Sequence, residues 1–112
     1  VTVSARQILN GAAAIANAPI PLAGAVPLNA VRANGLMGLG SSGVGTVSMD
    51  IYSAANGFGL ARQTATVSTA GGLYTSAFSN LAIITPQTWW VSASNAASGT
   101  PIFNAFITGY FI

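Results

Sequence analysis

Residues 44–68 read VGTVSMDIYSAANGFGLARQTATVS and alternate apolar with polar side chains on both sides of a turn. Within residues 44–53, Val47, Met49 and Ile51 would share one face, and the alternation resumes in residues 60–68. Successive side chains of a β-strand point to opposite faces, so each stretch predicts a strand with one buried face. The turn residues Ala-Ala-Asn-Gly at 54–57 are typical of a hairpin connection. We therefore predict a β-hairpin near the middle of the chain.

The polarity of the two strands favours one register for this hairpin. A three-residue loop would place Asp50 opposite Arg62 and Ile51 opposite Ala61, which keeps polar and apolar faces separate. A two-residue loop would place Asp50 opposite Gln63 and mix the faces. We expect Asp50 and Arg62 to form a surface ion pair, whose contribution to stability would be less than about 1 kcal/mol.

Turn residues divide the rest of the second half about every 8 to 12 positions, a spacing typical of all-β domains. The segments between these turns are rich in β-branched and aromatic residues. We expect further strands over residues 73–78, 81–85, 88–94 and 102–112, and a first strand over residues 1–9. The predicted fold is all-β, a β-sandwich or jelly roll of about seven or eight short antiparallel strands.

Residues 11–42 have a different composition, rich in Ala, Gly, Pro and Asn. Proline is excluded from central strands and from helix interiors, and three prolines, at 19, 21 and 27, fall in this segment. We interpret it as an extended arm with a short strand around residues 27–32 and a helical turn over residues 11–17. The chain is thus predicted to have two parts: a strand and arm over residues 1–42, and a sandwich core over residues 43–112.

The chain of 112 residues is nearly uncharged: 4% of its residues are charged, as three arginines and one aspartate, and it has no histidine or cysteine. These counts exclude a His/Cys zinc site, a pair of catalytic carboxylates and a Ser-His-Asp or Cys-His arrangement. We therefore expect no enzymatic activity, no catalytic residue, no metal and no cofactor. Three separated arginines do not form a phosphate-binding patch, so nucleic acid is not an expected partner. Prolines interrupt the uncharged residues 7–31, so no membrane span is expected either.

Residues 38–43, GLGSSG, match the pattern G-x-G-x-x-G letter for letter. In a dinucleotide site this pattern follows a strand, opens a helix and precedes an acidic residue by about twenty positions. Here the residues that follow, Val-Gly-Thr-Val, predict a strand, and no suitable acid lies downstream. We interpret the motif as a flexible loop that enters the sandwich.

The dipeptide Trp89-Trp90 places two large aromatic side chains on opposite faces of one expected strand. Trp89 shares a face with Val91 and Ala93, so we assign it to the core. Trp90 shares a face with Ser92 and would be exposed unless something covers it. An edge loop or the arm is one possible cover; a subunit contact or a bound carbohydrate is the other.

The last expected strand is apolar on both faces, with Phe103, Ala105, Ile107 and Phe111 alternating with Ile102, Phe106, Tyr110 and Ile112. The outer face of a two-sheet sandwich is normally polar. No charge follows Arg62, so an isolated monomer with this surface would aggregate. We therefore expect a homo-oligomer, whose interface includes Trp90, Phe106, Tyr110, Ile112, Val1 and Val3.

Several segments together resemble small β-sandwich virion proteins of tailed bacteriophages, of the capsid decoration or cement type. They are the leading VSAR at residues 3–6, the Pro/Ala segment, GVGTVSMDIYSAANG at 43–57, TWWVSASNAASG at 88–99 and the aliphatic last strand. The resemblance covers mainly residues 43–112. It implies a structural subunit of an extracellular particle, assembled as a trimer, with the major capsid protein or other virion subunits as partners.

Two other functions remain open on the sequence. One is a pilin-like subunit, in which residues 1–9 would be donated as a strand to the sheet of the next subunit. The other is a carbohydrate-binding or receptor-binding tail module, in which Trp90 and Tyr52 would act as stacking platforms.

Overall fold

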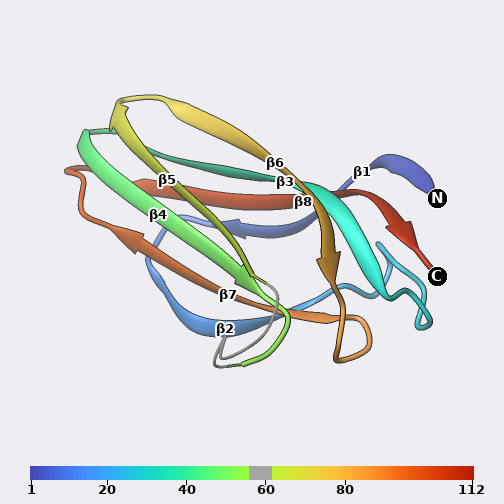
Figure 1. The fold of residues 1–112 in the computed structure, drawn as a ribbon. Coiled ribbons are helices and arrows are strands. Elements are labelled where there is room, and N and C mark those ends of the chain that lie inside the picture. The colour runs from blue at the N-terminus through green and yellow to red at the C-terminus, as the bar shows by residue number, and fades with distance from the viewer. Residues whose placement is uncertain (56–61) are drawn as a thin grey trace.

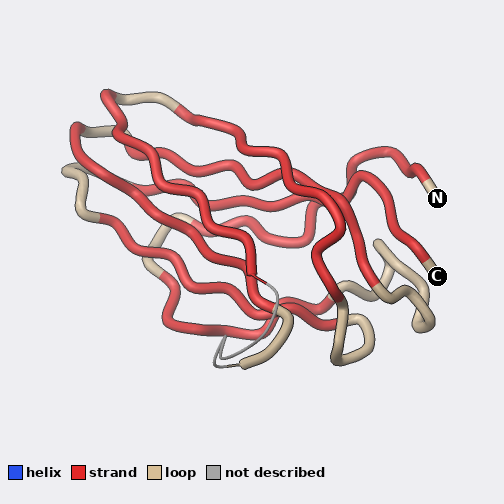
Figure 2. The backbone as a smooth tube through the Cα atoms, in the orientation of Figure 1, coloured by secondary structure: helices blue, strands red, loops and turns tan. Residues whose placement is uncertain are grey.

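The computed structural model describes residues 1–55 and 62–112, which form antiparallel strands arranged in two facing sheets (Figure 1). The strands are β1 (Thr2–Gly11), β2 (Ile15–Pro21), β3 (Arg32–Ser41), β4 (Val44–Tyr52), β5 (Arg62–Ala70), β6 (Leu73–Ala82), β7 (Thr88–Asn95) and β8 (Pro101–Phe111). Figure 2 shows that the residues in these two ranges form strands and the loops between them. In these two ranges no helix is long and apolar enough to cross a membrane.

The strand order is that of a jelly roll. One sheet has the order β1-β8-β3-β6 and the other the order β2-β7-β4-β5. Apart from β4 and β5, which are neighbours in one sheet, each strand is followed by a strand of the other sheet. Two four-stranded antiparallel sheets joined in this way are the jelly-roll arrangement. The predicted all-β sandwich is confirmed.

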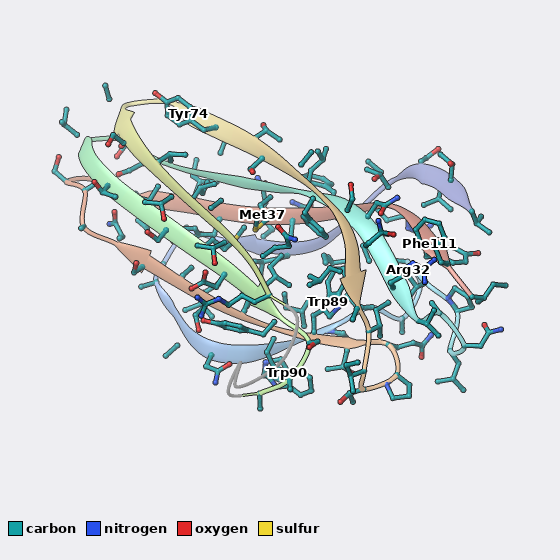
Figure 3. The ribbon with its side chains drawn as sticks, viewed as in Figure 1. Arg32, Met37, Tyr74, Trp89, Trp90 and Phe111 are labelled. Atoms are coloured by element: carbon teal, nitrogen blue, oxygen red, sulfur yellow. The ribbon has the colours of Figure 1, made fainter. Side chains whose placement is uncertain are left out.

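The core lies between the sheets and follows the predicted alternation. Val47, Met49 and Ile51 are fully buried, as is Trp89, while Trp90 lies on the other side of β7 (Figure 3). The Trp89 ring meets Phe78 of the opposite sheet edge-on, with 5.7 Å between centroids. Its indole N–H donates to the Ala82 carbonyl over 3.0 Å, which satisfies the polar atom that such a ring brings into a core.

The segment expected to be an arm is built into the sandwich. Residues 1–42 contain β1, β2 and β3, which pair with β8, β7 and β6 of the same chain, so no structural boundary falls at residue 42. The helical turn expected over residues 11–17 is wrong, because β1 continues to Gly11 and β2 starts at Ile15. The strand expected around residues 27–32 lies later, as β3. Pro19 and Pro21 are compatible with a strand because β2 is at a sheet edge, where a missing N–H need not break a ladder.

The GLGSSG motif also differs from the flexible loop we expected. Gly38 and Gly40 lie inside β3, a central strand between β8 and β6, and only the end of the motif turns into β4. These glycines lower the strand propensity of β3, but they allow neighbouring segments of the same chain to approach its backbone closely. A Cβ on Gly40 would collide with the backbone of Gly72.

The β4–β5 register differs from the predicted one by two residues. Asp50 pairs with Thr64, and Arg62 pairs with Tyr52, so the expected opposition of Asp50 and Arg62 is wrong. A register shift of two residues leaves every side chain on the same face of the sheet. The alternation of polar and apolar residues excludes a shift of one residue, but it cannot distinguish two registers that differ by two residues. The remaining parts of the hairpin prediction, including Ala61 and the Asn-Gly pair, lie outside the described residues.

Bulges change the expected strands in β6 and β8. The predicted strands over residues 73–78 and 81–85 are one strand, β6, whose register with β3 shifts near Asn80, a residue with φ of 56°. In β8 the register with β3 shifts at Thr108. Beyond this bulge Tyr110 pairs with the buried Ala33 and packs against the core, whereas Phe111 lies beside the exposed Arg32. The expected positions of Tyr110 and Phe111 are therefore exchanged.

Serine hydroxyls join the β3–β4 turn to the β7–β8 connection. The Ser41 hydroxyl donates to the Ser98 carbonyl over 2.6 Å, and the Val44 amide donates to the Ser98 hydroxyl over 3.1 Å. The Thr100 amide donates to the Ser42 hydroxyl over 2.8 Å. Each turn thus supplies polar partners for backbone groups of the other.

Ser41→Ala should lower the free energy of unfolding by about 1 kcal/mol, because it removes from a buried position the hydroxyl that donates to the Ser98 carbonyl and accepts from the Gly43 amide. Urea denaturation followed by circular dichroism measures this loss. Ser68→Ala, on the exposed face of β5, is the matched control and should change stability by less than about 0.5 kcal/mol. Equal losses in the two variants would contradict this role of Ser41.

Candidate functional site

The outer face of the β1-β8-β3-β6 sheet is apolar at its centre. Phe106 pairs with Leu36, and Leu36 pairs with Ala77 on the far side of β3. Their neighbours along the strands, Met37 and Ala105, point into the core, so these three side chains point outward. We call this surface the β8 face; it consists of Leu36, Leu73, Ala77, Ile102 and Phe106.

The β8 face carries further exposed apolar groups at its other end. Ile102 and Leu73 both pair with Gly40, one from each side, and are 43% and 53% exposed. The backbone of Gly72 lies where a side chain of Gly40 would be, so Gly40 itself is buried between these two. No charged residue belongs to the face, but Asn104 and Thr75, which pair with Gly38 from either side, form a polar row between its two apolar ends. Such a surface favours burial against another apolar surface.

The same sheet ends in exposed apolar residues where the two termini lie (Figure 1). The Val31 amide donates to the Phe111 carbonyl and the Ile83 amide to the Val31 carbonyl, each over 2.8 Å, so the strand ends are adjacent. The side chains exposed there are Val1, Val31, Ile84 and Ile112, which we call the terminal rim.

The residues expected at an interface lie in four places. Phe106 is on the β8 face, and Val1 and Ile112 belong to the terminal rim. Val3 and Tyr110 are partly buried and pack against the core. The β8 bulge explains the position of Tyr110.

Trp90, the remaining expected interface residue, lies on the opposite sheet. It pairs with Tyr52 on β4 and with Pro19 on β2, and all three point away from the core. Trp90 is half-buried rather than exposed. Asn17, at a bulge of β2, donates to the Ala55 carbonyl, which joins the start of the β4–β5 connection to β2 across β7.

Next to this aromatic pair the sheet surface is hollowed. The hollow, of about 240 Å³, is lined by Ile15, Ser48, Asp50, Ser92, Ala93 and Ser94. Asp50 pairs with Ser92, and Ser48 pairs with Ser94. The serines and the aspartate point outward because Val47, Met49 and Val91 are buried in the core. We call this site the Asp50 hollow.

Asp50 has an unusual hydrogen-bond environment. Its Oδ2 accepts from the Tyr52 hydroxyl over 3.2 Å. Its Oδ1 is buried and has no donor among the described residues. The Arg62 guanidinium lies over the Tyr52 ring, 5.8 Å from its centroid. Arg62 pairs with Tyr52 across the two strands, whereas Asp50 pairs with Thr64. Sequence alternation placed Asp50, Tyr52 and Trp90 outward, but only the register brings them together.

Within residues 1–55 and 62–112 there is no group of three His, Cys, Asp or Glu side chains that could hold a metal ion. No family model, curated protein or solved structure matches the chain.

Proposed function

We propose that this chain is a structural subunit that self-associates through the β8 face, as a capsid decoration or cement protein of a virion. The observation that carries the proposal is an uncharged outer sheet face with two rows of apolar side chains, on a chain with four charged residues in all. The resemblance to small virion proteins supports a virion as the particle to which the subunit belongs, and jelly rolls are a common architecture of capsid proteins.

The β8 face favours association that depends little on salt. Leu36 and Phe106 are side by side at its centre, and Ile102 and Leu73 flank Gly40. Removing apolar surface from water contributes about 25 cal/mol per Å². Salt screens interactions between charges but does not weaken burial of this kind. A shell that must survive outside a cell would gain from such contacts.

A closed oligomer, for which a trimer is the expected form, would leave the terminal rim free for a second partner. The rim places Val1, Val31, Ile84 and Ile112 at one end of the same sheet. In our proposal this end contacts the capsid lattice. The apolar side chains of the two surfaces then have separate roles, self-association and attachment.

Strand donation is less favoured by the position of β1. Residues 2–11 pair with β8 of their own chain, and the N-terminal amine donates to the Tyr110 carbonyl over 2.6 Å. A pilin-like subunit would instead place this strand in a neighbour's sheet. Donation would therefore require β1 to leave a ladder that it already completes.

Phe106→Glu should convert the oligomer to a monomer, because it places a charge at the centre of the β8 face, where burial without a partner is strongly unfavourable. Sedimentation velocity of the wild-type and variant chains measures the change. Ser68→Glu, on the exposed outer side of β5, adds the same charge elsewhere and should leave the mass unchanged. A Phe106→Glu chain that keeps the wild-type mass would exclude the β8 face as the interface.

The virion setting has its own test. Particles purified from cultures that produce the chain should contain it in many copies, and washing with about 1 M salt should not remove it. Its absence from such particles would contradict the decoration role, and its release by salt would show that charge rather than burial attaches it.

A further inference from the structure

We propose that the Asp50 hollow, together with Tyr52 and Trp90, binds a neutral saccharide. The site lies on the outer side of the β2-β7-β4-β5 sheet, opposite the β8 face. It would remain accessible in an oligomer built through the β8 face, so this binding activity adds to the assembly role and does not depend on it.

The dimensions of the hollow limit its occupant to a small ring. Its volume, about 240 Å³, is below the roughly 300–1,000 Å³ of pockets that enclose drug-sized ligands. The lining comes from strands β2, β7 and β4, so it is held by the sheet itself. The Asn17–Ala55 contact adds a further link across β7 beside it. The site is therefore largely preformed, which reduces the entropy lost on binding.

The polar groups of the hollow match the hydroxyl groups of a sugar. Ser48, Ser92 and Ser94 can each donate and accept, and the Asp50 carboxylate accepts. Asp50 lines the hollow, and its buried Oδ1 has no donor among the described residues, so a rotation of the carboxylate that gives up the Tyr52 hydrogen bond is needed to bring this oxygen to a ligand. A sugar hydroxyl would then donate to a charged oxygen, which gives a stronger hydrogen bond than a neutral acceptor.

The aromatic side chains provide the second element of the site. Tyr52 and Trp90 pair across β4 and β7, one row along the sheet from Asp50 and Ser92. Two residues along a strand span roughly 6.6 Å, so a second ring joined to one in the hollow would reach the aromatic pair. The C–H face of a pyranose is apolar and packs against aromatic rings, whose polar atoms remain available at the edge.

Other small ligands fit the same groups less well. Calcium takes six to eight oxygen ligands and magnesium an octahedral set, whereas the hollow offers one carboxylate. A phosphate would be repelled by Asp50, and the nearest described cation, Arg62, is placed over the Tyr52 ring. A neutral polyol with an apolar face uses the carboxylate, the hydroxyls and the aromatic rings together.

The test is titration of the full chain with cellotetraose, maltotetraose, chitotetraose and mannotetraose, each up to about 10 mM, followed by saturation-transfer NMR and calorimetry. We expect at least one of them to bind. Asp50→Asn, which keeps the side-chain volume, should weaken that binding at least about tenfold, equivalent to about 1.4 kcal/mol. Trp90→Ala should weaken it as well, and Ser68→Ala, farther along the same sheet on β5, should not.

Ser92→Ala is the second site variant, because it removes one hydroxyl of the hollow and leaves the charge in place. It should weaken binding severalfold while the circular dichroism spectrum stays unchanged. If none of the four tetrasaccharides binds, the proposal is wrong. It is also wrong if one binds with equal affinity to the wild-type, Asp50→Asn and Ser92→Ala chains, since the sugar would then lie elsewhere.

Discussion

Trp89→Ala should lower the free energy of unfolding by about 3–5 kcal/mol, the cost of removing a large aromatic side chain from a core. Trp89 is fully buried, packs edge-on against Phe78 of the other sheet and donates to the Ala82 carbonyl. Truncation removes the inter-sheet contact and leaves a cavity as well as an unpaired carbonyl. For a protein with a typical stability of about 5–15 kcal/mol, this loss is a large fraction of the total.

The adjacent tryptophan provides the matched control. Trp90→Ala removes a side chain of the same size from the half-buried outer face and should lower stability by about 1 kcal/mol. Both variants should be compared with the wild type by urea denaturation at the same protomer concentration, because the stability of an oligomer depends on concentration. Equal losses would contradict the assignment of the two tryptophans to opposite faces.

Gly35→Ala should lower stability by about 2–3 kcal/mol, because a Cβ at this position would overlap with a packed backbone and ring. Gly35 lies in β3, between the bulged regions of β6 and β8. The added atom would collide with the Phe106 carbonyl oxygen and with the Phe78 ring. Neither neighbour can move without displacing a strand or the core contact with Trp89.

Gly72→Ala is the control for Gly35→Ala. A Cβ there would meet only the Tyr74 ring, at 3.6–3.7 Å, which is ordinary van der Waals contact. We expect a change within about 0.5 kcal/mol, measured by thermal unfolding under the same conditions. A Gly35→Ala chain as stable as the Gly72→Ala chain would show that β3 is not packed as closely as described.

Strands β4 and β5 could be predicted from sequence because their alternation has one apolar side and one polar side. Val47, Met49 and Ile51 show this pattern, and they are buried as expected. β2 and β3 lack it. Two prolines in β2 are tolerated only because the strand is at an edge, and the glycines of β3 are required by close neighbours. Both reasons depend on strands far away in sequence.

Bulges and register set the other limits of prediction. A bulge at Thr108 inserts one residue, so the faces of Tyr110 and Phe111 are exchanged without any change in composition. The two-residue shift between β4 and β5 leaves each side chain on its expected face. The sequence pattern therefore could not show that Arg62 pairs with Tyr52 and not with Asp50.

The outward direction of single site residues could be predicted from the sequence, but which of these residues lie together could not. Phe106 and Trp90 were expected on outward faces, and both lie there, but on opposite sheets. Tyr52 and Trp90 were named together as possible stacking platforms, and their pairing across β4 and β7 brings them side by side. Ser92 was expected on the face of Trp90, yet the hollow that it forms with Asp50 and Ser94 requires the cross-strand register.

The most direct test of the central claim is the mass of the purified chain in solution, by light scattering after size exclusion, over a wide range of protomer concentration and in high salt. Self-association through the β8 face predicts a discrete oligomer, expected at three times the 11.2 kDa of one chain, that persists in about 1 M salt. A stable, soluble monomer at every concentration would contradict the claim, because the apolar β8 face would then be compatible with exposure to water.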